Sequence, residues 1–338
     1  MEKPKSIIII IFSCLYFIFI IISIQKNKLL IEVDISKAKF EGGGPVQLQK
    51  GISKVLPYQT KKCLFVPVDG IEPTKNKKNV DYFYLSFPCM IEQTYDLWKH
   101  YNRTNSLLLG PCFVPNHWSR FPVNIYWKER RFREILQSIK AVVVHSARVR
   151  DHLASRSNNL DLLNKFILLR PCTYLKPRSI KPFNERNIDI LFYEKYPDLN
   201  RRKQAKKLLK LLNKTDKRIE KLKSGKYVRS QLSSLAYDSK FVIYFSFYDT
   251  GALALKEIQN YGVIAFSHQQ DLAFSNETSY YIHELTYNDM KPAFKKIMKI
   301  IDDVSKKNPD TKRIAKINQE YTDCKRALDD LCEGITKQ

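Results

Sequence analysis

The chain has 338 residues, of which 44% are hydrophobic, and its 58 Lys and Arg against 34 Asp and Glu give a formal net charge of +24. The hydrophobic fraction can fill the cores of two domains of ordinary size, which excludes a disordered protein. The positive charge favours phosphates, anionic lipid head groups or nucleic acid as partners, and charge alone does not choose among them.

The N-terminal segment predicts a membrane anchor. Ser6 to Ile24 is a run of 19 uncharged residues rich in Ile and Phe. A helix of that length spans roughly 28 Å, close to the hydrocarbon core of one bilayer. A cleaved signal peptide is the alternative, but such signals usually have an apolar core of about 7 to 15 residues and a small-x-small cleavage site. We therefore assign residues 1–28 to a cytoplasmic tail and a transmembrane signal anchor.

The orientation of this anchor is predicted from the rest of the chain, because two lysines precede it and two follow it. Six of the seven cysteines lie outside it, which permits disulfides in an oxidising compartment. Acceptor triplets for N-glycosylation begin at Asn102, Asn213 and Asn276. Together these features predict a single-pass type II membrane protein of the Golgi or endoplasmic reticulum, with its body in the lumen.

Residues 29–182 are predicted to form a first α/β domain. Leu29 to Asp34 has the pattern of a strand, and the glycine-rich loop 42–45 leads into a helix from Val46 to Val55. Apolar-periodic segments fall between several further strand signals, at residues 63–68, 80–87, 106–109 and 141–145. Alternation of this kind indicates a parallel sheet with helices on both faces.

Residues 183–338 are predicted to form a second domain, because a proline-punctuated segment ends at residue 182. Strands are expected at 188–193, 241–245 and 263–266, and helices at 227–239, at 251–261 and from 290 onward. The basic run 201–223 is expected to be a helix, either an anion-binding one or a solvated one with a single buried stripe. We therefore predict two doubly wound parallel-sheet domains facing a cleft, where ligands bind at the carboxyl ends of strands.

Residues 241–267 form the most informative stretch, in which a buried strand leads into a turn, a helix, a glycine and a second buried strand. Thr250 is expected to be the helix N-cap and Gly262 to follow the last turn. A helix beginning at Gly251 would direct free backbone N–H groups and its positive dipole end at the cleft. The small side chain would let a phosphate approach closely.

Two acidic residues flank this helix start. Asp249 and Glu257 are eight residues apart, or roughly 12 Å along a helix, so they cannot bind one atom together. They could contact the two ends of an extended ligand such as a nucleotide-sugar. By residue type alone, an Asp near a helix cap and a Glu on a helix surface are also ordinary.

The pattern resembles the donor-binding segment of retaining GT-B glycosyltransferases, in which an acidic residue, seven others and a Glu precede a Gly and a hydrophobic strand. Glu257 and Gly262 match this pattern, whereas Asp249 stands where the family usually has Glu. The loop beginning Gly42-Gly-Gly-Pro looks like the family's N-terminal glycine loop, which would place Gly43 and Gly44 near donor and acceptor. The resemblance spans most of residues 30–300 and is specific around 241–267.

The resemblance also implies roles for individual residues. Glu257 would bind the donor ribose, Asp249 would contact the transferred sugar as a catalytic residue, and the Gly251 amide beside Thr250 would bind the phosphate. The family is a GT-B fold with two facing α/β domains, so the chain is expected to share that fold.

Basic residues are expected at the diphosphate. Lys195 and Arg202 look like the family's diphosphate-binding residues, and such cations stabilise a departing nucleoside diphosphate as negative charge develops. His145 ends a predicted strand and would be a catalytic-site contact to sugar or acceptor, with a structural histidine as the alternative.

Motifs that are missing from the sequence narrow the choice. No Asp-x-Asp pair occurs, so we expect no metal and no cofactor beyond the nucleotide-sugar substrate. Residues 42–44 are not followed by the Gly-Lys-Ser/Thr of a P-loop, which argues against an ATPase.

The sequence therefore predicts a membrane-anchored glycosyltransferase of the hexosyltransferase type that is retaining and metal-independent. Its expected partners are a nucleotide-sugar donor and a glycan, glycoprotein or glycolipid acceptor. No nucleic acid is expected to bind. Two alternatives stay open: an anchored protein that binds polyanions or glycans without catalysis, and an inactive glycosyltransferase-like fold.

Overall fold

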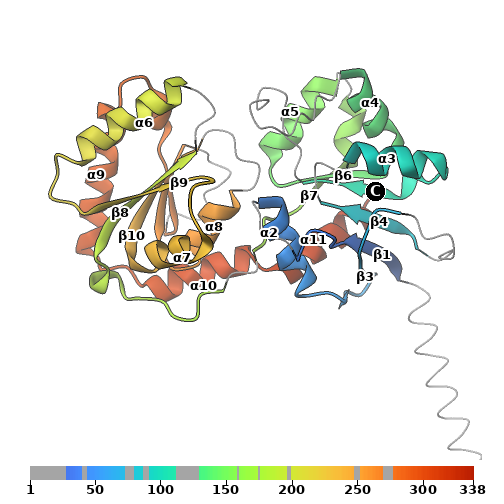
Figure 1. The fold of residues 1–338 in the computed structure, drawn as a ribbon, viewed down its shortest axis with the longest axis horizontal. Coiled ribbons are helices and arrows are strands. Elements are labelled where there is room, and N and C mark those ends of the chain that lie inside the picture. The colour runs from blue at the N-terminus through green and yellow to red at the C-terminus, as the bar shows by residue number, and fades with distance from the viewer. Residues whose placement is uncertain are drawn as a thin grey trace, which may run out of the picture.

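The computed structural model describes residues 28–39, 44–72, 80–86, 91–111, 129–157, 160–173, 176–195, 199–246, 252–268 and 277–338. It has two lobes side by side, each built on its own sheet (Figure 1). The predicted anchor, Ser6 to Ile24, lies outside these residues. Of the helices that the structure does describe, none is long and apolar enough to cross a membrane.

The first sheet has seven strands in the order β2-β3-β1-β4-β5-β6-β7. The short strand β2 pairs antiparallel with β3, and the other neighbours are parallel. The strands are β1 Leu29–Asp34, β2 Tyr58–Gln59, β3 Cys63–Val68, β4 Tyr82–Leu85, β5 Leu107–Leu109, β6 Ala141–Val144 and β7 Phe166–Leu168. The central strands β5 and β6 are apolar runs buried on both faces, as expected for a sheet covered by helices.

Helices cover both faces of this sheet. One face packs on α2 (Gly44–Ser53), and the other packs on α3 (Ile91–His100), α4 (Glu129–Ser138) and α5 (Ala147–Ser157). The helix predicted from Val46 begins two residues earlier, at Gly44.

The last helix of the chain, α11 (Cys324–Thr336), belongs to the first half. Its buried residues, including Leu328, Leu331 and Ile335, share one hydrophobic core with β1, β3 and α2. Disulfides Cys63–Cys332 and Cys172–Cys324 join it to that half. The predicted division at residue 183 therefore does not hold for α11, because the chain returns to complete the core of the first sheet.

The second sheet has five parallel strands in the order β12-β11-β10-β8-β9. They are β8 Ile188–Lys195, β9 Ile219–Lys223, β10 Ser239–Ser246, β11 Ile264–Ser267 and β12 Ser279–Tyr281. The basic run 201–223 is not one helix, since α6 (Leu199–Leu212) ends midway and the run's last residues form β9. Ile219 and Leu222 contribute apolar side chains to the two faces of this edge strand.

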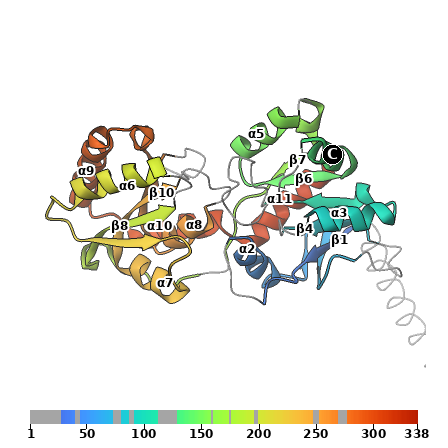
Figure 2. The same ribbon diagram turned by 45° about the horizontal axis from the view of Figure 1, so that its top comes forward.

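Helices also cover both faces of the second sheet. α6 and α9 (Lys291–Lys306) pack on one face, and α7 (Arg229–Asp238) and α8 (Leu253–Gln259) pack on the other (Figure 2). α10 (Thr311–Tyr321) lies along the lower edge of this lobe in Figure 1 and leads towards the first. Predicted doubly wound architecture is therefore present in both halves.

Candidate functional site

The segment after β10 begins the predicted donor site. Asp249, Thr250 and Gly251 lie outside the described residues, as does Gly43, so their roles stay predictions. α8 begins at Leu253, two residues later than predicted. Its N-cap position is held by Ala252, with φ 44° and no side-chain cap, so the prediction of Thr250 as N-cap is wrong.

Gly262 follows α8 in the conformation that the sequence predicts. Its φ is +79°, in the left-handed region that favours glycine. A Cβ atom there would lie 2.3 Å from the backbone oxygen of Thr311 at the start of α10. Glycine is therefore needed both for the turn and for the close approach of α10, which places α8 against the rest of the site.

Glu257 is the central residue of the site. It is only 3% exposed. Its Oε1 atom accepts a hydrogen bond of 3.1 Å from Thr173 Oγ1 and forms an ion pair with the Arg229 guanidinium. Among the described residues no group donates to Oε2. The alternative of a solvent-exposed helix residue is wrong, because this carboxylate is buried and held by two partners.

Three separate segments meet at this carboxylate. Arg229 is the first residue of α7, and Thr173 lies in the segment that joins the two sheets. The Thr173 backbone N–H donates to the carbonyl of Thr322, on the returning segment between α10 and α11. Sequence reasoning missed both partners of Glu257, since neither Arg229 nor Thr173 stands in a motif and only the tertiary fold brings them together.

The first half contributes α2 to this region, and its predicted site residue His145 lies at the end of a strand. α2, which begins at Gly44, contacts α8. His145 directly follows β6, and its Nδ1 lies 2.9 Å from the carbonyl oxygen of Leu169. A carbonyl only accepts, so this nitrogen carries the proton. The contact supports the structural alternative for His145, and contact with a sugar stays a prediction.

The two basic residues predicted for the diphosphate are placed differently. Lys195 is the last residue of β8 and pairs in register with Ser246 at the end of β10, so it lies at the carboxyl edge of the sheet. Arg202 is exposed on the first turn of α6. The neighbouring Arg201 is more buried, and its Nη1 donates to Gln204 Oε1 at 2.9 Å and to the Thr286 carbonyl at 3.3 Å.

His268 is a candidate site residue that sequence reasoning missed. It directly follows β11, and burial lowers its pKa to about 3, with the positive charges of Arg201, Arg148 and His283 lowering it further. Arg148 comes from α5 of the first half, so positive charge from both halves gathers near the strand ends. A histidine directly after a buried strand, the signal used for His145, would have found it.

No protein-family model matches the chain, and no curated protein matches its sequence. Solved structures match it over nearly its whole length. The apo form of the lipopolysaccharide outer core galactosyltransferase WaaB is similar with a TM-score of 0.54 and 9% identity, over 91% of this chain and 99% of that chain. Sucrose-phosphate synthase from Thermosynechococcus elongatus is similar with a TM-score of 0.50 and 11% identity, over 92% and 97% respectively. The chain therefore shares the two-domain α/β fold of these structures, the GT-B fold.

Proposed function

We propose that this protein is a glycosyltransferase that binds a nucleotide-sugar beside the carboxyl ends of the second sheet, around Glu257. The observation that carries the proposal is Glu257, whose side chain is only 4% exposed, at the junction of two GT-B halves, with Arg229 and Thr173 both on Oε1 and no donor to Oε2 among the described residues. A carboxylate has two acceptor oxygens, and a ribose hydroxyl is a donor suited to the second one.

The remaining roles belong to the same proposal. Asp249 contacts the transferred sugar, the amide of Gly251 binds the phosphate with Thr250 beside it at the donor, and Lys195 and Arg202 neutralise the diphosphate. The reaction proceeds with retention of configuration and transfers a hexose to a glycan, glycoprotein or glycolipid. Its metal independence rests on the missing Asp-x-Asp pair, and loss of transfer in EDTA that manganese restores would contradict it.

The test of the central assignment is calorimetric titration of UDP and of GDP into wild type and Glu257→Gln. The variant keeps the shape of the side chain but removes its charge. A hydrogen bond to a charged group contributes about 1.5–3 kcal/mol, so affinity should fall roughly ten- to a hundredfold.

Glu277→Gln is the matched control, because Glu277 is an exposed carboxylate paired with Arg313 at 3.0 Å. It should bind as wild type does. Unchanged affinity in Glu257→Gln, or no binding of either nucleotide by wild type, would remove the support for this function.

We further propose that the body of the protein is luminal, behind a type II anchor at Ser6 to Ile24. Support comes from two disulfides, which persist in oxidising compartments, and from the exposed positions of Asn102 and Asn213. The third acceptor, Asn276, lies outside the described residues. Glycosidase treatment should increase the electrophoretic mobility of the expressed protein. Digestion of residues 29–338 by protease added outside sealed microsomes would contradict the luminal assignment.

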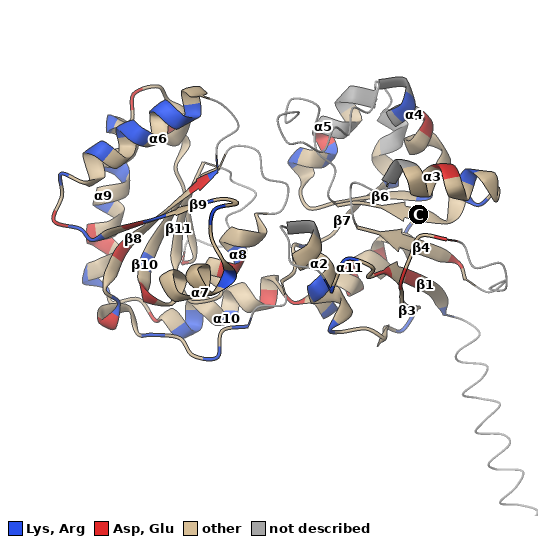
Figure 3. Cartoon of the chain, in the orientation of Figure 1, with Lys and Arg blue, Asp and Glu red and all other residues tan. Residues whose placement is uncertain are grey.

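One observation favours a second candidate, a polyanion-binding protein without catalysis. α6 contains no acidic residue, and Lys203, Lys206 and Lys210 are exposed on it with no acidic partner in the described part of the chain. Figure 3 shows this basic helix at the outer side of the second lobe. Such a protein would show strongly salt-dependent binding that ignores Glu257→Gln.

A further inference from the structure

Arg229 and Thr173 both contact the same carboxylate oxygen of Glu257. The Arg229 guanidinium and the Thr173 hydroxyl, at 3.1 Å, both contact Oε1. The Arg229 side chain is 24% exposed and that of Glu257 is 4% exposed, so the ion pair is largely shielded from water. In such surroundings an ion pair holds a carboxylate in one orientation, and removing one partner leaves the other charge buried and uncompensated.

Both contacts to Oε1 are made by side chains of the protein itself. A carboxylate that is already oriented needs less ordering when the ligand arrives, which strengthens binding without adding a contact to the ligand. α7 also packs against α8, so the residue that begins α7 and the residue within α8 belong to helices whose positions are fixed relative to each other.

We propose that Arg229 is a positioning residue of the donor site, and that Thr173 assists it: together they hold Oε1 of Glu257, so that Oε2 is the atom offered to a ribose hydroxyl of a nucleoside diphosphate. The inference rests on the proposed function. It adds two residues that act through Glu257 and make no contact with the donor themselves.

Thr173 brings the junction of the two halves into this arrangement. It follows Cys172, whose disulfide to Cys324 joins the outgoing segment between the halves to the returning one. The Thr173 N–H bonds to the Thr322 carbonyl at 3.2 Å, which links the same two segments again. The orientation of the donor-binding carboxylate therefore depends on the position of the junction as well as on α7 and α8.

The test is a double-mutant cycle on the full chain, with UDP and GDP as calorimetric probes. Arg229→Ala should weaken binding of the nucleotide that wild type prefers by about tenfold or more, and Thr173→Val by roughly threefold to tenfold. In the Glu257→Gln background, Arg229→Ala should cause no further loss, because a residue that acts through Glu257 has nothing left to position.

Conservative variants separate positioning from folding. Arg229→Lys keeps the charge and should recover part of the affinity, whereas Arg229→Gln should not, and both decide the question if Arg229→Ala fails to fold. In a transfer assay the loss should appear mainly in KM for the donor rather than in kcat. Arg313→Ala is the matched control, because it removes an exposed Arg–Glu pair, and it should leave affinity unchanged.

Each contrary result has a distinct meaning. Additive losses in Arg229→Ala and Glu257→Gln would show that Arg229 binds the nucleotide directly and would overturn the positioning role. Weakened binding in Glu257→Gln with wild-type affinity in all Arg229 variants would overturn the inference and leave the proposed function standing. Failure of wild type to bind either nucleotide would overturn both.

Discussion

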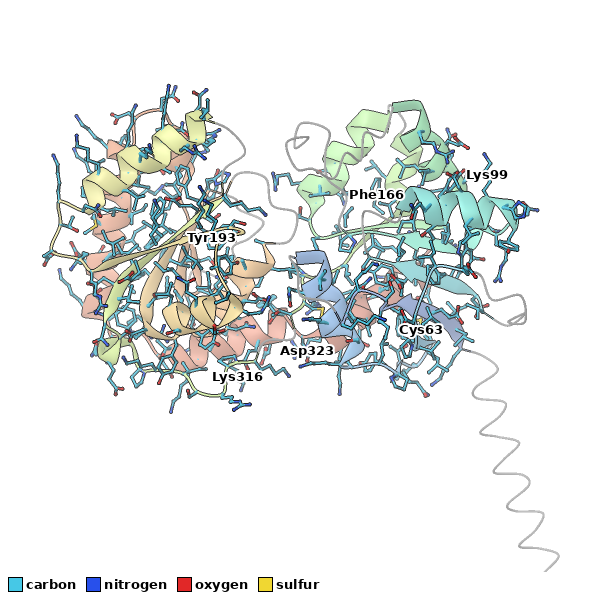
Figure 4. The ribbon with its side chains drawn as sticks, in the orientation of Figure 1. Cys63, Lys99, Phe166, Tyr193, Lys316 and Asp323 are labelled. Carbon is cyan, nitrogen blue, oxygen red and sulfur yellow. A yellow bond between two sulfur atoms is a disulfide. The ribbon has the colours of Figure 1, made fainter. Side chains whose placement is uncertain are left out.

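The hydrophobic cores of the two halves are built in different ways. The first half is completed by α11, from the far end of the chain, and is joined to it by Cys63–Cys332 and Cys172–Cys324. No cysteine occurs between residues 173 and 323, and the second half relies on apolar packing, including Tyr193 and Tyr244 stacked with ring centroids 4.9 Å apart. Figure 4 shows Cys63 and Tyr193 at these two locations.

This difference separates what each half depends on. The second half takes its core from one continuous stretch of chain, so its packing can form among neighbours in sequence. The first half depends on residues up to 269 positions apart, and closing such a distance costs conformational entropy that a cross-link removes from the unfolded state. Changes to α11 or its cross-links should therefore affect the first half selectively.

The largest effect is expected from Cys63→Ser with Cys332→Ser. Loss of a cross-link over this separation should lower the free energy of unfolding of the first half by about 4 to 5 kcal/mol. Scanning calorimetry should show two unfolding transitions. Compared with wild type, that of the first half should move to lower temperature and that of the second half should not. A single transition that moves as a whole would break the comparison, because the halves would then unfold as one unit.

Leu331→Ala should have the next largest effect. Leu331 is fully buried in α11, and truncation of such a leucine costs roughly 3 kcal/mol through lost burial and the cavity left behind. Chemical denaturation followed by fluorescence should show the loss in the first half. Ile297→Ala, at a fully buried position of α9, is the counterpart and should destabilise the second half instead.

Gly262→Ala tests the second half at the turn after α8. An added Cβ would meet the Thr311 backbone oxygen, and φ +79° is unfavourable for alanine, so unfolding free energy should fall by about 2 to 3 kcal/mol. Gly225→Ala is the matched control: its φ is +74° with no atom within 4 Å of the added Cβ. Gly225→Ala should lower the free energy of unfolding only by the cost of a positive φ for alanine. Equal losses in both variants would show that the contact with α10 adds no steric cost at Gly262.

The smallest expected effect is the pH dependence due to His268. Its folded pKa of about 3 lies below the ordinary value of 6.5, so the unfolded state binds the proton more readily. The stability that neutral His268 gives the folded state is complete above pH 6.5 and is lost as pH falls towards 3. The free energy of unfolding should fall by about 2 kcal/mol between pH 6.5 and 5. His268→Gln should flatten this part of the stability profile, whereas the exposed His100→Gln should not. A profile unchanged by His268→Gln would contradict the burial argument.

Much of the fold was predictable because the relevant signals are local. The apolar runs 188–193, 241–245 and 263–266 lie within strands β8 and β10 or overlap β11, and the alternation with helices predicted parallel sheets. Gly262 was predictable from its place between helix and strand. The end of α6 was not, because residues 219–223 combine basic and apolar side chains in a pattern that suits a helix face and an edge strand equally well.

The site was predictable only in part. Sequence spacing and family resemblance singled out Glu257, and the structure buries it at the domain junction. The resemblance could not supply Arg229 and Thr173, which lie 28 and 84 positions away from Glu257 and meet it through folding. His268 carried a usable local signal, its position directly after a buried strand.

By itself, the sequence determined the periodicities, and with them the α/β class, the strand runs and the glycine turn, because these depend on residues a few positions apart. The tertiary structure alone decided that α11 returns to the first half, which cysteines pair, and which groups hold Oε1 of Glu257. Those outcomes depend on contacts between segments far apart in the sequence. Such contacts stabilise the protein through burial and ion pairing that exist only in the folded chain, so no short-range pattern encodes them.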